Sequence, residues 1–237
     1  MTDDKLITDL ERFERGEIPS VFGELCVQLP RAPVSQQAKR EKKEGLTRDL
    51  RDALAKYQFF LTGDVQLELE WLVHERVRYE SDEGADVDNI LKPTLDALSG
   101  PKGILIDDCQ VQSVASHWID WNCDMQQLNI RLRHAPDAFM SRVPMALVDL
   151  GRNLYMPLDT SLSNPVRAVI VTALRKQIEL RDNLEALGAD FSMSRAIMSI
   201  QRPFHRSRLG TGFRLGSLEQ YCDGTIPMTP KFTSGKD

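Results

Sequence analysis

The sequence lacks closely spaced cysteines, clustered histidines and long apolar runs. Its four histidines are dispersed, so they do not predict a metal site. No apolar run approaches the ~20 residues that a membrane-spanning helix needs. The four cysteines form no C-x-x-C pair, which excludes the commonest zinc and redox motifs and indicates reduced thiols. They are Cys26, Cys109, Cys123 and Cys222.

The amino-terminal residues also lack the basic start and the apolar core of a signal peptide, so we expect a cytoplasmic protein. The chain is 41% hydrophobic and 27% charged, which is ordinary for a globular protein of one or two domains. Its net charge of −5 argues against a protein that coats nucleic acid non-specifically. The charge is compatible with a nuclease that has local basic patches and an acidic metal site.

Residues 22–135 show the alternation of strands and helices that is typical of an α/β domain with a small mixed sheet. Apolar and polar residues alternate in two segments, which predicts strands, and the segment between them has helical spacing. Pro93 is expected near the start of a short helix, where its missing N–H has the least effect. The expected elements are a strand at 25–29, a helix at 35–57, a strand at 65–77, a helix at 89–98 and a hairpin at 111–133.

The flanking segments differ from this central domain. Residues 1–21 are polar and are expected to form an N-terminal arm or a short helix. Residues 136–237 are expected to form a helical C-terminal extension, with one helix starting at Asn164 and another over 192–201. Beyond Pro203 the apolar periodicity is weak, which predicts a basic, partly ordered tail.

Four aspartates and one lysine lie close together around the second expected helix. Asp86 and Asp88 stand at its start, and the N-terminus of a helix favours negative charge nearby. Lys92 follows one turn after Asp88. Asp107 and Asp108 end a short apolar run in a different element, so folding can bring them beside the first pair. Carboxylates at this density repel one another without a cation, and a hard divalent metal is the simplest cation to stabilise them.

This set of side chains suits metal-assisted hydrolysis of a phosphodiester. Carboxylates hold Mg²⁺, which keeps several of its waters, and one metal-bound water acts as the nucleophile. A lysine stabilises the charge of the transition state or the leaving oxygen. The alternative interpretation is that these are ordinary surface charges, with Lys92 paired to Asp88 and Asp96 along the helix.

Other acidic motifs fit the segment less well. An EF-hand starting at Asp86 would need Asp or Asn in place of Ile90, Gly in place of Leu91 and Glu in place of Ala97. A phosphatase-type D-x-D would close a buried apolar strand, whereas residues 81–85 are polar. A sugar-nucleotide transferase also uses D-x-D, but the chain is short for that fold and has no second signature. A metal-dependent phosphatase or sugar transferase stays as an alternative function.

The combined pattern D-x-D-N-x-x-K-x-x-x-D-A-L, a short glycine-containing loop and D-D-x-Q-V resembles the RusA-type crossover-junction endodeoxyribonuclease family. The order of the flanking strands and helices is similar as well, and the resemblance covers roughly residues 22–135. The matching residues are Asp86, Asp88, Asn89, Lys92, Asp96, Ala97, Leu98, Gly100, Asp107, Asp108, Gln110 and Val111.

The resemblance implies a small α/β homodimer that acts in DNA recombination and repair. Such a protein binds Holliday junctions or other branched DNA and cuts them symmetrically with Mg²⁺, or with Mn²⁺ as the alternative ion. By position, Asp86, Asp88 and Asp108 would be catalytic, metal-binding carboxylates. Lys92 would be the catalytic lysine, and Asp107 would be a further metal ligand.

Two neighbouring residues have other expected roles, because Asn89 would brace the start of the helix and Asp96 would pair with Lys92. The sequence also departs from the family pattern twice. The loop before the motif is often basic in this family, whereas residues 80–83 read Glu-Ser-Asp-Glu. Residues 138–237 lie outside the usual small domain. These departures favour a second hypothesis, a junction-binding or regulatory module that kept the fold with weak or lost cleavage.

Contacts to DNA phosphates would need Lys and Arg near the acidic site. Basic residues occur in the first expected helix and at the end of the second strand, where the alternative is a solvated surface. The tail combines basic and aromatic residues, as suits a nucleic-acid arm. The candidates are Lys39, Arg40, Lys42, Lys43, Arg76 and Arg78 in the central domain, and Arg202, His205, Arg206, Arg208 and Arg214 with Phe204 and Phe213 in the tail.

Overall fold

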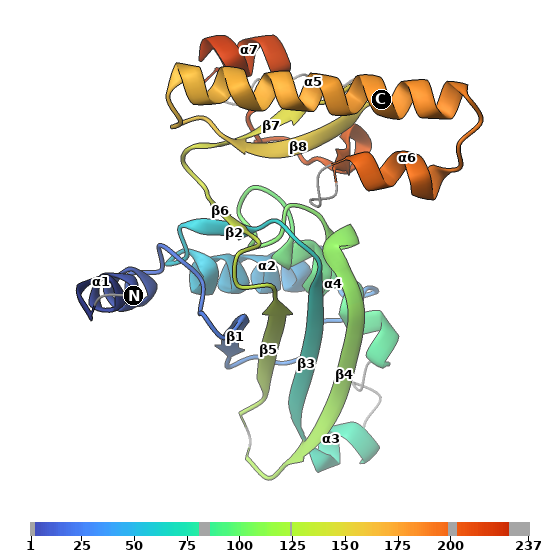
Figure 1. The fold of residues 1–237 in the computed structure, drawn as a ribbon. Coiled ribbons are helices and arrows are strands. Elements are labelled where there is room, and N and C mark those ends of the chain that lie inside the picture. The colour runs from blue at the N-terminus through green and yellow to red at the C-terminus, as the bar shows by residue number, and fades with distance from the viewer. Residues whose placement is uncertain (1–2, 81–85, 124, 199–202, 228–237) are drawn as a thin grey trace. The chain divides into compact units, whose positions relative to one another are not determined.

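The computed structural model describes residues 3–80, 86–123, 125–198 and 203–227 (Figure 1). The chain divides into two units, residues 1–141 and 142–237. The division lies beyond the expected boundary near residue 135 because β6 (Phe139–Ser141) pairs with β2 (Phe59–Leu61) of the first unit. None of the described helices is long and apolar enough to span a membrane.

The first unit is built on a four-stranded mixed sheet. Its strands are β1 (Glu24–Leu29), β3 (Val65–His74), β4 (Val111–Trp121) and β5 (Gln127–His134). The strand order is β1-β5-β3-β4, with β3 antiparallel to β5 and parallel to β4. The helices are α1 (Asp3–Glu14), α2 (Arg40–Leu54), α3 (Glu75–Glu80), α4 (Val87–Leu98) and the 3-10 turn η1 (Asp108–Gln110). This arrangement confirms the expected α/β class.

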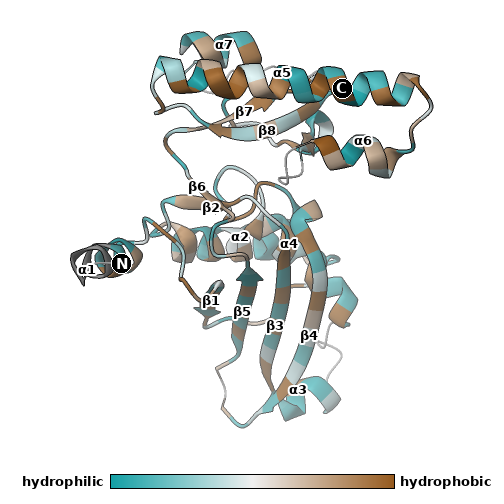
Figure 2. Ribbon diagram, viewed as in Figure 1, coloured by the Kyte–Doolittle hydropathy of each residue, from teal (hydrophilic) through white to brown (hydrophobic). Residues whose placement is uncertain are grey.

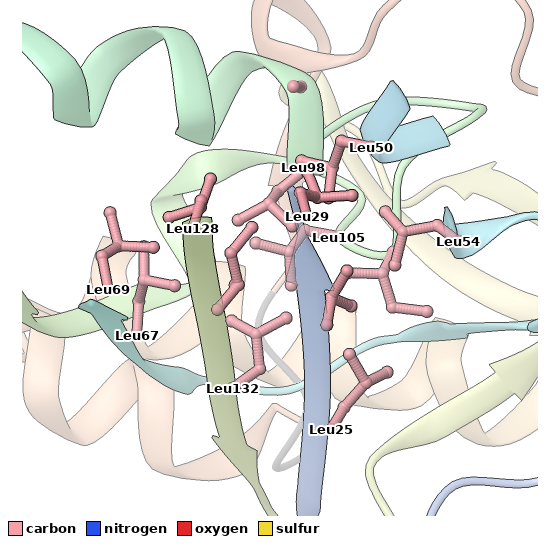
Figure 3. Packing of buried hydrophobic residues seen from close by; sticks show 14 of the residues in the cluster. Leu25, Leu29, Leu50, Leu54, Leu67, Leu69, Leu98, Leu105, Leu128 and Leu132 are labelled. Atoms are coloured by element: carbon pink, nitrogen blue, oxygen red, sulfur yellow. The ribbon is translucent and has the colours of Figure 1, made fainter. Parts of the chain in front are cut away.

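The core of the first unit lies on one face of the sheet. Side chains alternate along β1 and β3, so apolar residues such as Leu67 and Leu69 share a face, and Figure 2 shows the corresponding bands. Helices α2 and α4 cover this face with Leu50, Leu54 and Leu98, which Figure 3 shows beside the strand leucines. Full burial of a leucine stabilises the fold by about 1.5–3 kcal/mol, so this layer holds α4 firmly on the sheet.

The connection between β4 and β5 differs from the expected hairpin. The two strands follow each other in sequence, but β3 lies between them and pairs with both. The chain therefore crosses over from β3 to the parallel strand β4 through α3 and α4, and β5 then returns on the other side of β3. Such a crossover requires an intervening helical segment, which α3 and α4 provide. Strand β3 also ends at His74, before the expected end at Val77.

Pro93 lies inside α4 rather than near its start, because the helix begins at Val87. Proline has no N–H, so the carbonyl of Asn89, four residues before it, loses its usual helical donor. The backbone N–H of Gln36 donates to that carbonyl at 2.7 Å. The side chain of Asn89 accepts a further bond from Gln37 at 2.8 Å. Asn89 thus braces the start of the helix against the segment that precedes α2.

The second unit contains a sheet that the expected helical extension did not include. Its strands are β7 (Met145–Asp149), β8 (Leu154–Asp159), β9 (Phe204–His205) and β10 (Leu215–Ser217), in the order β10-β7-β8-β9. The pair β10–β7 is parallel, and the pairs β7–β8 and β8–β9 are antiparallel. The helices are α5 (Asn164–Ala186), α6 (Phe191–Ile197), α7 (Leu218–Asp223) and the 3-10 turn η2 (Arg206–Arg208).

Residues 204–227, the described part of the expected partly ordered tail, form short strands, turns and a helix. Phe204, Leu209, Phe213 and Tyr221 are each at most 5% exposed. The hydroxyl of Tyr221 donates to the carbonyl of Asp159 at 2.9 Å, which ties α7 to the end of β8. The sequence pattern misses this region because its buried residues sit in two- and three-residue strands and turns, which are too short to show a period.

Candidate active site

The head of α4 presents two carboxylates. Asp86 is the N-cap residue, and its side chain makes no capping hydrogen bond. Asp88 lies in the first turn, and both side chains are exposed. The positive end of the helix dipole favours anions at this position, and an N-cap aspartate normally uses an oxygen to accept from the helix backbone. The oxygens of Asp86 are therefore left out of helix capping.

Lys92 joins the two halves of the acidic motif. Its Nζ lies 2.7 Å from Oδ1 of Asp96, one turn further along α4, and 3.1 Å from Oδ2 of Asp108 in η1. The bond to Asp96, and then the bond to Asp108, raise the pKa of Lys92 above its ordinary value of 10.5. The lysine is thus a cation at neutral pH. Its pairing with Asp96 confirms the expected role of that residue.

Gln110 fixes the turn that carries Asp107 and Asp108. It is 3% exposed, and its Oε1 accepts from the backbone N–H groups of Ile106 and Asp107. Its Nε2 donates to the carbonyls of Leu61 and Gly63, each at 2.9 Å. All four bonds are to backbone, so this one side chain holds the turn against the β2–β3 connection. The position of Asp108 follows from that anchoring.

Asp107 has a structural task in the same turn. Its Oδ1 accepts from the backbone N–H of Cys109 at 3.0 Å, and it forms a capping box with Gln110. The interaction occupies one carboxylate oxygen in holding the turn. Asp107 is therefore the weaker of the two candidate ligands from this segment.

The donor chemistry of the candidate set fits a hard divalent cation, because Asp86, Asp88 and Asp108 offer only carboxylate oxygens. Within the described ranges, however, no three or more His, Cys, Asp or Glu side chains are grouped so as to hold a metal ion. The structure brings Lys92 and Asp108 together but does not gather the three expected ligands around one point. The carboxylate of Asp108 interacts with Lys92 in this arrangement.

Asp86 also lines a cavity of about 460 Å³. The cavity lies between the head of α4, the start of α2 and the ends of β3 and β4, and its apolar lining includes Val73 and Trp118. Lys42 and Arg78 contribute cationic side chains to the same lining. Both cations were candidates from the sequence pattern, whereas Trp118 was not. The available signal was an aromatic residue in a strand whose other residues are mostly polar or small.

Most of the basic candidates of the first unit already form ion pairs or hydrogen bonds with other protein groups. Arg40 pairs with Glu44 at 2.6 Å, Arg76 with Glu80 at 3.5 Å and Arg78 with Asp120 at 2.8 Å. Lys43 donates to the carbonyl of Gln36, and Lys39 is the N-cap residue of α2. Among these candidates, Lys42 and Arg78 line the cavity beside Asp86.

The candidates in the tail fall into two groups, the phenylalanines and the basic residues. Phe204 and Phe213 are 3% and 5% exposed, so these rings are buried in the second unit and are not the exposed aromatic residues that a nucleic-acid arm needs. Arg214 donates to the carbonyls of Val143 and Pro227 and so holds backbone in place. Among the other basic candidates, Arg202 falls outside the described residues, as do residues 81–83 of the acidic loop at 80–83.

The comparisons with known proteins concern the first unit. Residues 30–133 match the family model described as "Endodeoxyribonuclease RusA". The match includes α2, the central strands, α4 and η1, and it ends before the second unit begins. No curated protein matches the chain.

Proposed function

From the RusA-type domain that residues 30–133 form, we propose that this protein is a Mg²⁺-dependent, structure-selective DNA endonuclease. It cuts Holliday junctions or other branched DNA by phosphodiester hydrolysis, in recombination and repair. The observation that carries the proposal is the contact between Lys92 of α4 and Asp108 of η1, because it joins the two halves of the motif at one place.

In this proposal Asp86, Asp88 and Asp108 hold the cation, for which Mn²⁺ is an alternative, and Asp107 is a secondary ligand. The bound ion supplies an activated water and offsets negative charge on the phosphate. Lys92 keeps its proton, since its carboxylate partners raise its pKa, and it places a positive charge beside the phosphate that is cut. Asp96 positions Lys92, and Gln110 positions the turn that carries Asp108.

We further propose that the active form is a homodimer. A four-way junction is resolved by two related incisions, and a two-fold symmetric protein presents two equal sites to two equivalent strands. The six basic candidates of the first unit supply phosphate contacts around each site, and Lys42 and Arg78 line the same cavity as Asp86.

The test compares the wild type with Asp88→Asn on a synthetic four-way junction and on a linear duplex, with and without Mg²⁺. We expect symmetric, Mg²⁺-dependent cleavage of the junction by the wild type and its loss in the variant. Asp52→Asn is the matched control, because it makes the same change at an exposed position of α2. Equal activity of Asp88→Asn and Asp52→Asn would contradict the proposed site.

One observation favours a second candidate function, a junction-binding module with weak or lost cleavage. The described carboxylates do not form a group of three, and Asp108 interacts with Lys92. Under this alternative, wild type and Asp88→Asn bind the junction equally and neither cuts it. If neither protein interacts with any DNA, both candidates fail, and a metal-dependent phosphatase or sugar transferase is the remaining hypothesis.

A further inference from the structure

The cavity beside Asp86 combines a flat aromatic wall with cationic groups. Trp118 of β4 pairs in register with Trp71 of β3, so both indoles stand on the helix-covered face of the sheet. Their ring centroids are 6.5 Å apart, and the fully buried Trp71 backs Trp118. Trp118 itself is only partly buried and lines the cavity. The fold therefore holds one indole in a fixed position at the wall of a hollow.

The remaining lining mixes apolar and polar surface, with charged groups of both signs. Pro33 and Val73 add apolar surface, whereas Lys42 and Arg78 add cations. Arg78 is held by Asp120 at 2.8 Å, and its side chain is still 32% exposed. A volume of about 460 Å³ lies within the range of about 300–1,000 Å³ that is typical of small-molecule sites. A hollow that combines apolar surface with cationic groups suits a flat ring that carries a phosphate.

We propose that this cavity accepts one unstacked nucleotide of the DNA strand that is cut, with its base on Trp118 and its phosphate near Lys42 and Arg78. The proposal rests on the proposed nuclease function and names a substrate feature for the same site. Asp86 belongs to both the cavity and the acidic set, so a nucleotide seated there lies next to the phosphate that reacts.

Selection of branched DNA follows from this arrangement. Removing a base from an intact duplex requires unstacking and unpairing, and the requirement is smallest where the base is already unpaired. Bases at a branch point meet that condition more often than bases within a helix. Every base has a π-face, so the stack on Trp118 tolerates any sequence, and Lys42 and Arg78 contact the backbone alone. The cavity thus selects DNA by its branched structure at the cutting site and tolerates any sequence.

The experiment measures binding of a four-way junction in EDTA, where cleavage does not interfere. Single abasic positions are placed in turn around the branch point. For the wild type, we expect one position to weaken binding by roughly 10-fold. Trp118→Leu keeps an apolar side chain against Trp71 but removes the stacking surface, so it binds the intact junction roughly 10-fold more weakly. Its binding is unaffected by the abasic position to which the wild type is sensitive.

Trp121→Leu is the matched control, since it removes an indole from the same strand at a position that does not line the cavity. It must keep the wild-type response to the abasic series. If Trp118→Leu does not fold, Trp118→Phe is used instead. A 2-aminopurine base is then placed at the position where loss of the base weakens binding by the wild type. Its fluorescence is quenched in the wild-type complex and is quenched less in the Trp118→Phe complex.

The outcomes separate this proposal from the nuclease function. If the wild type cuts junctions and Asp88→Asn does not, but no abasic position depends on Trp118, the nuclease function stands and the nucleotide cavity is refuted. Equal quenching of 2-aminopurine with tryptophan and phenylalanine at position 118 would also refute it. If the wild type binds no branched DNA, the nuclease function fails and the cavity proposal fails with it.

Discussion

The two units have similar sheets but bury their charged side chains to different degrees. Each has a four-stranded sheet that contains a parallel pair, β3–β4 in the first unit and β10–β7 in the second. The charges of the first unit's motif remain accessible, since the side chains of Lys92 and Asp108 are 48% and 31% exposed. In the second unit, Arg167 and Arg181 of α5 are 7% and 6% exposed.

Both buried arginines bond to groups of their own unit, and the Nε of Arg181 donates to Oδ1 of Asp182 at 2.8 Å. Arg167 donates to the carbonyl of Thr160 at 2.9 Å and to the side chain of Asn164, and it packs under Gly224, whose positive φ of 73° ends α7. A Cβ at position 224 would approach its Nη2 to 2.6 Å. Removing a partner from a buried charge such as Arg167 is costly, whereas Lys92 is half exposed beside two carboxylates. Accessibility therefore separates the charges with candidate chemistry from those that hold the fold.

The largest effect is expected at Asp108. We expect Asp108→Asn to reduce cleavage of a four-way junction by at least ~100-fold, because it removes a charged candidate ligand next to Lys92. The thermal unfolding midpoint should change little, since the side chain is partly exposed. Asp223→Asn makes the same change at an exposed position of the second unit and should leave cleavage unaltered. Unchanged activity of Asp108→Asn would remove η1 from the site.

The next effect compares two glutamines that close capping boxes, Gln110 with Asp107 in the first unit and Gln220 with Ser217 in the second. Gln110→Ala leaves four backbone groups without their partner, and we expect a loss of about 2–4 kcal/mol in the free energy of unfolding. Gln220→Ala removes a half-buried cap and should lose about 1 kcal/mol. Urea denaturation measures both. Equal losses would show that burial of Gln110 adds nothing to its bonds.

Arg167 tests the charges of the second unit. Arg167→Ala leaves the carbonyl of Thr160 without this donor in a buried place, and we expect a loss of about 1–3 kcal/mol. Arg175→Ala breaks an exposed pair with Glu219 and should lose less than about 1 kcal/mol. Chemical denaturation followed by circular dichroism distinguishes the two variants. A larger loss for Arg175→Ala would overturn the assignment of structural and surface charges.

The smallest effect concerns pH and Lys92. Its pKa is raised in the folded protein, so its pairs stabilise the fold fully below pH 10.5, and the contribution disappears as pH rises through the folded value. Because the side chain is half exposed, we expect a difference of at most ~1 kcal/mol between wild type and Lys92→Met at neutral pH. The difference should shrink above pH 10.5. Lys176→Met, on α5 of the second unit, serves as the control. A difference that grows with pH would contradict a raised pKa of Lys92 in the folded protein.

The sequence predicts the parts of the first unit whose periods are long enough to read. Alternation identifies β1 and β3, and helical spacing identifies α2 and α4. It also identifies β4 and β5 as strands but predicts the wrong pairing for them, since spacing alone does not tell whether consecutive strands pair with each other or with a third strand. It also fails for the sheet of the second unit, where β9 and β10 have two and three residues.

The candidate site was predictable to a similar degree. The motif predicts Asp86, Asp88, Lys92 and Asp108 as candidates, because its residue types and spacing are local properties of the chain, and the structure brings Lys92 and Asp108 into contact. The cavity with Trp118 was not predictable, since it depends on the register that sets Trp118 beside Trp71. That register is a property of two strands about forty residues apart in the chain, which no local pattern specifies.

The proline inside α4 gives the molecule a natural reporter. The Gln36 amide that bonds to Asn89 is protected from hydrogen exchange only while the segment before α2 remains attached to the head of α4. Its exchange rate therefore measures how often these two pieces separate. Since Pro33 belongs to one piece and Asp86 to the other, the same rate reports how often these two parts of the cavity lining separate. The exchange of one amide thus reports the separation of these two segments beside the site.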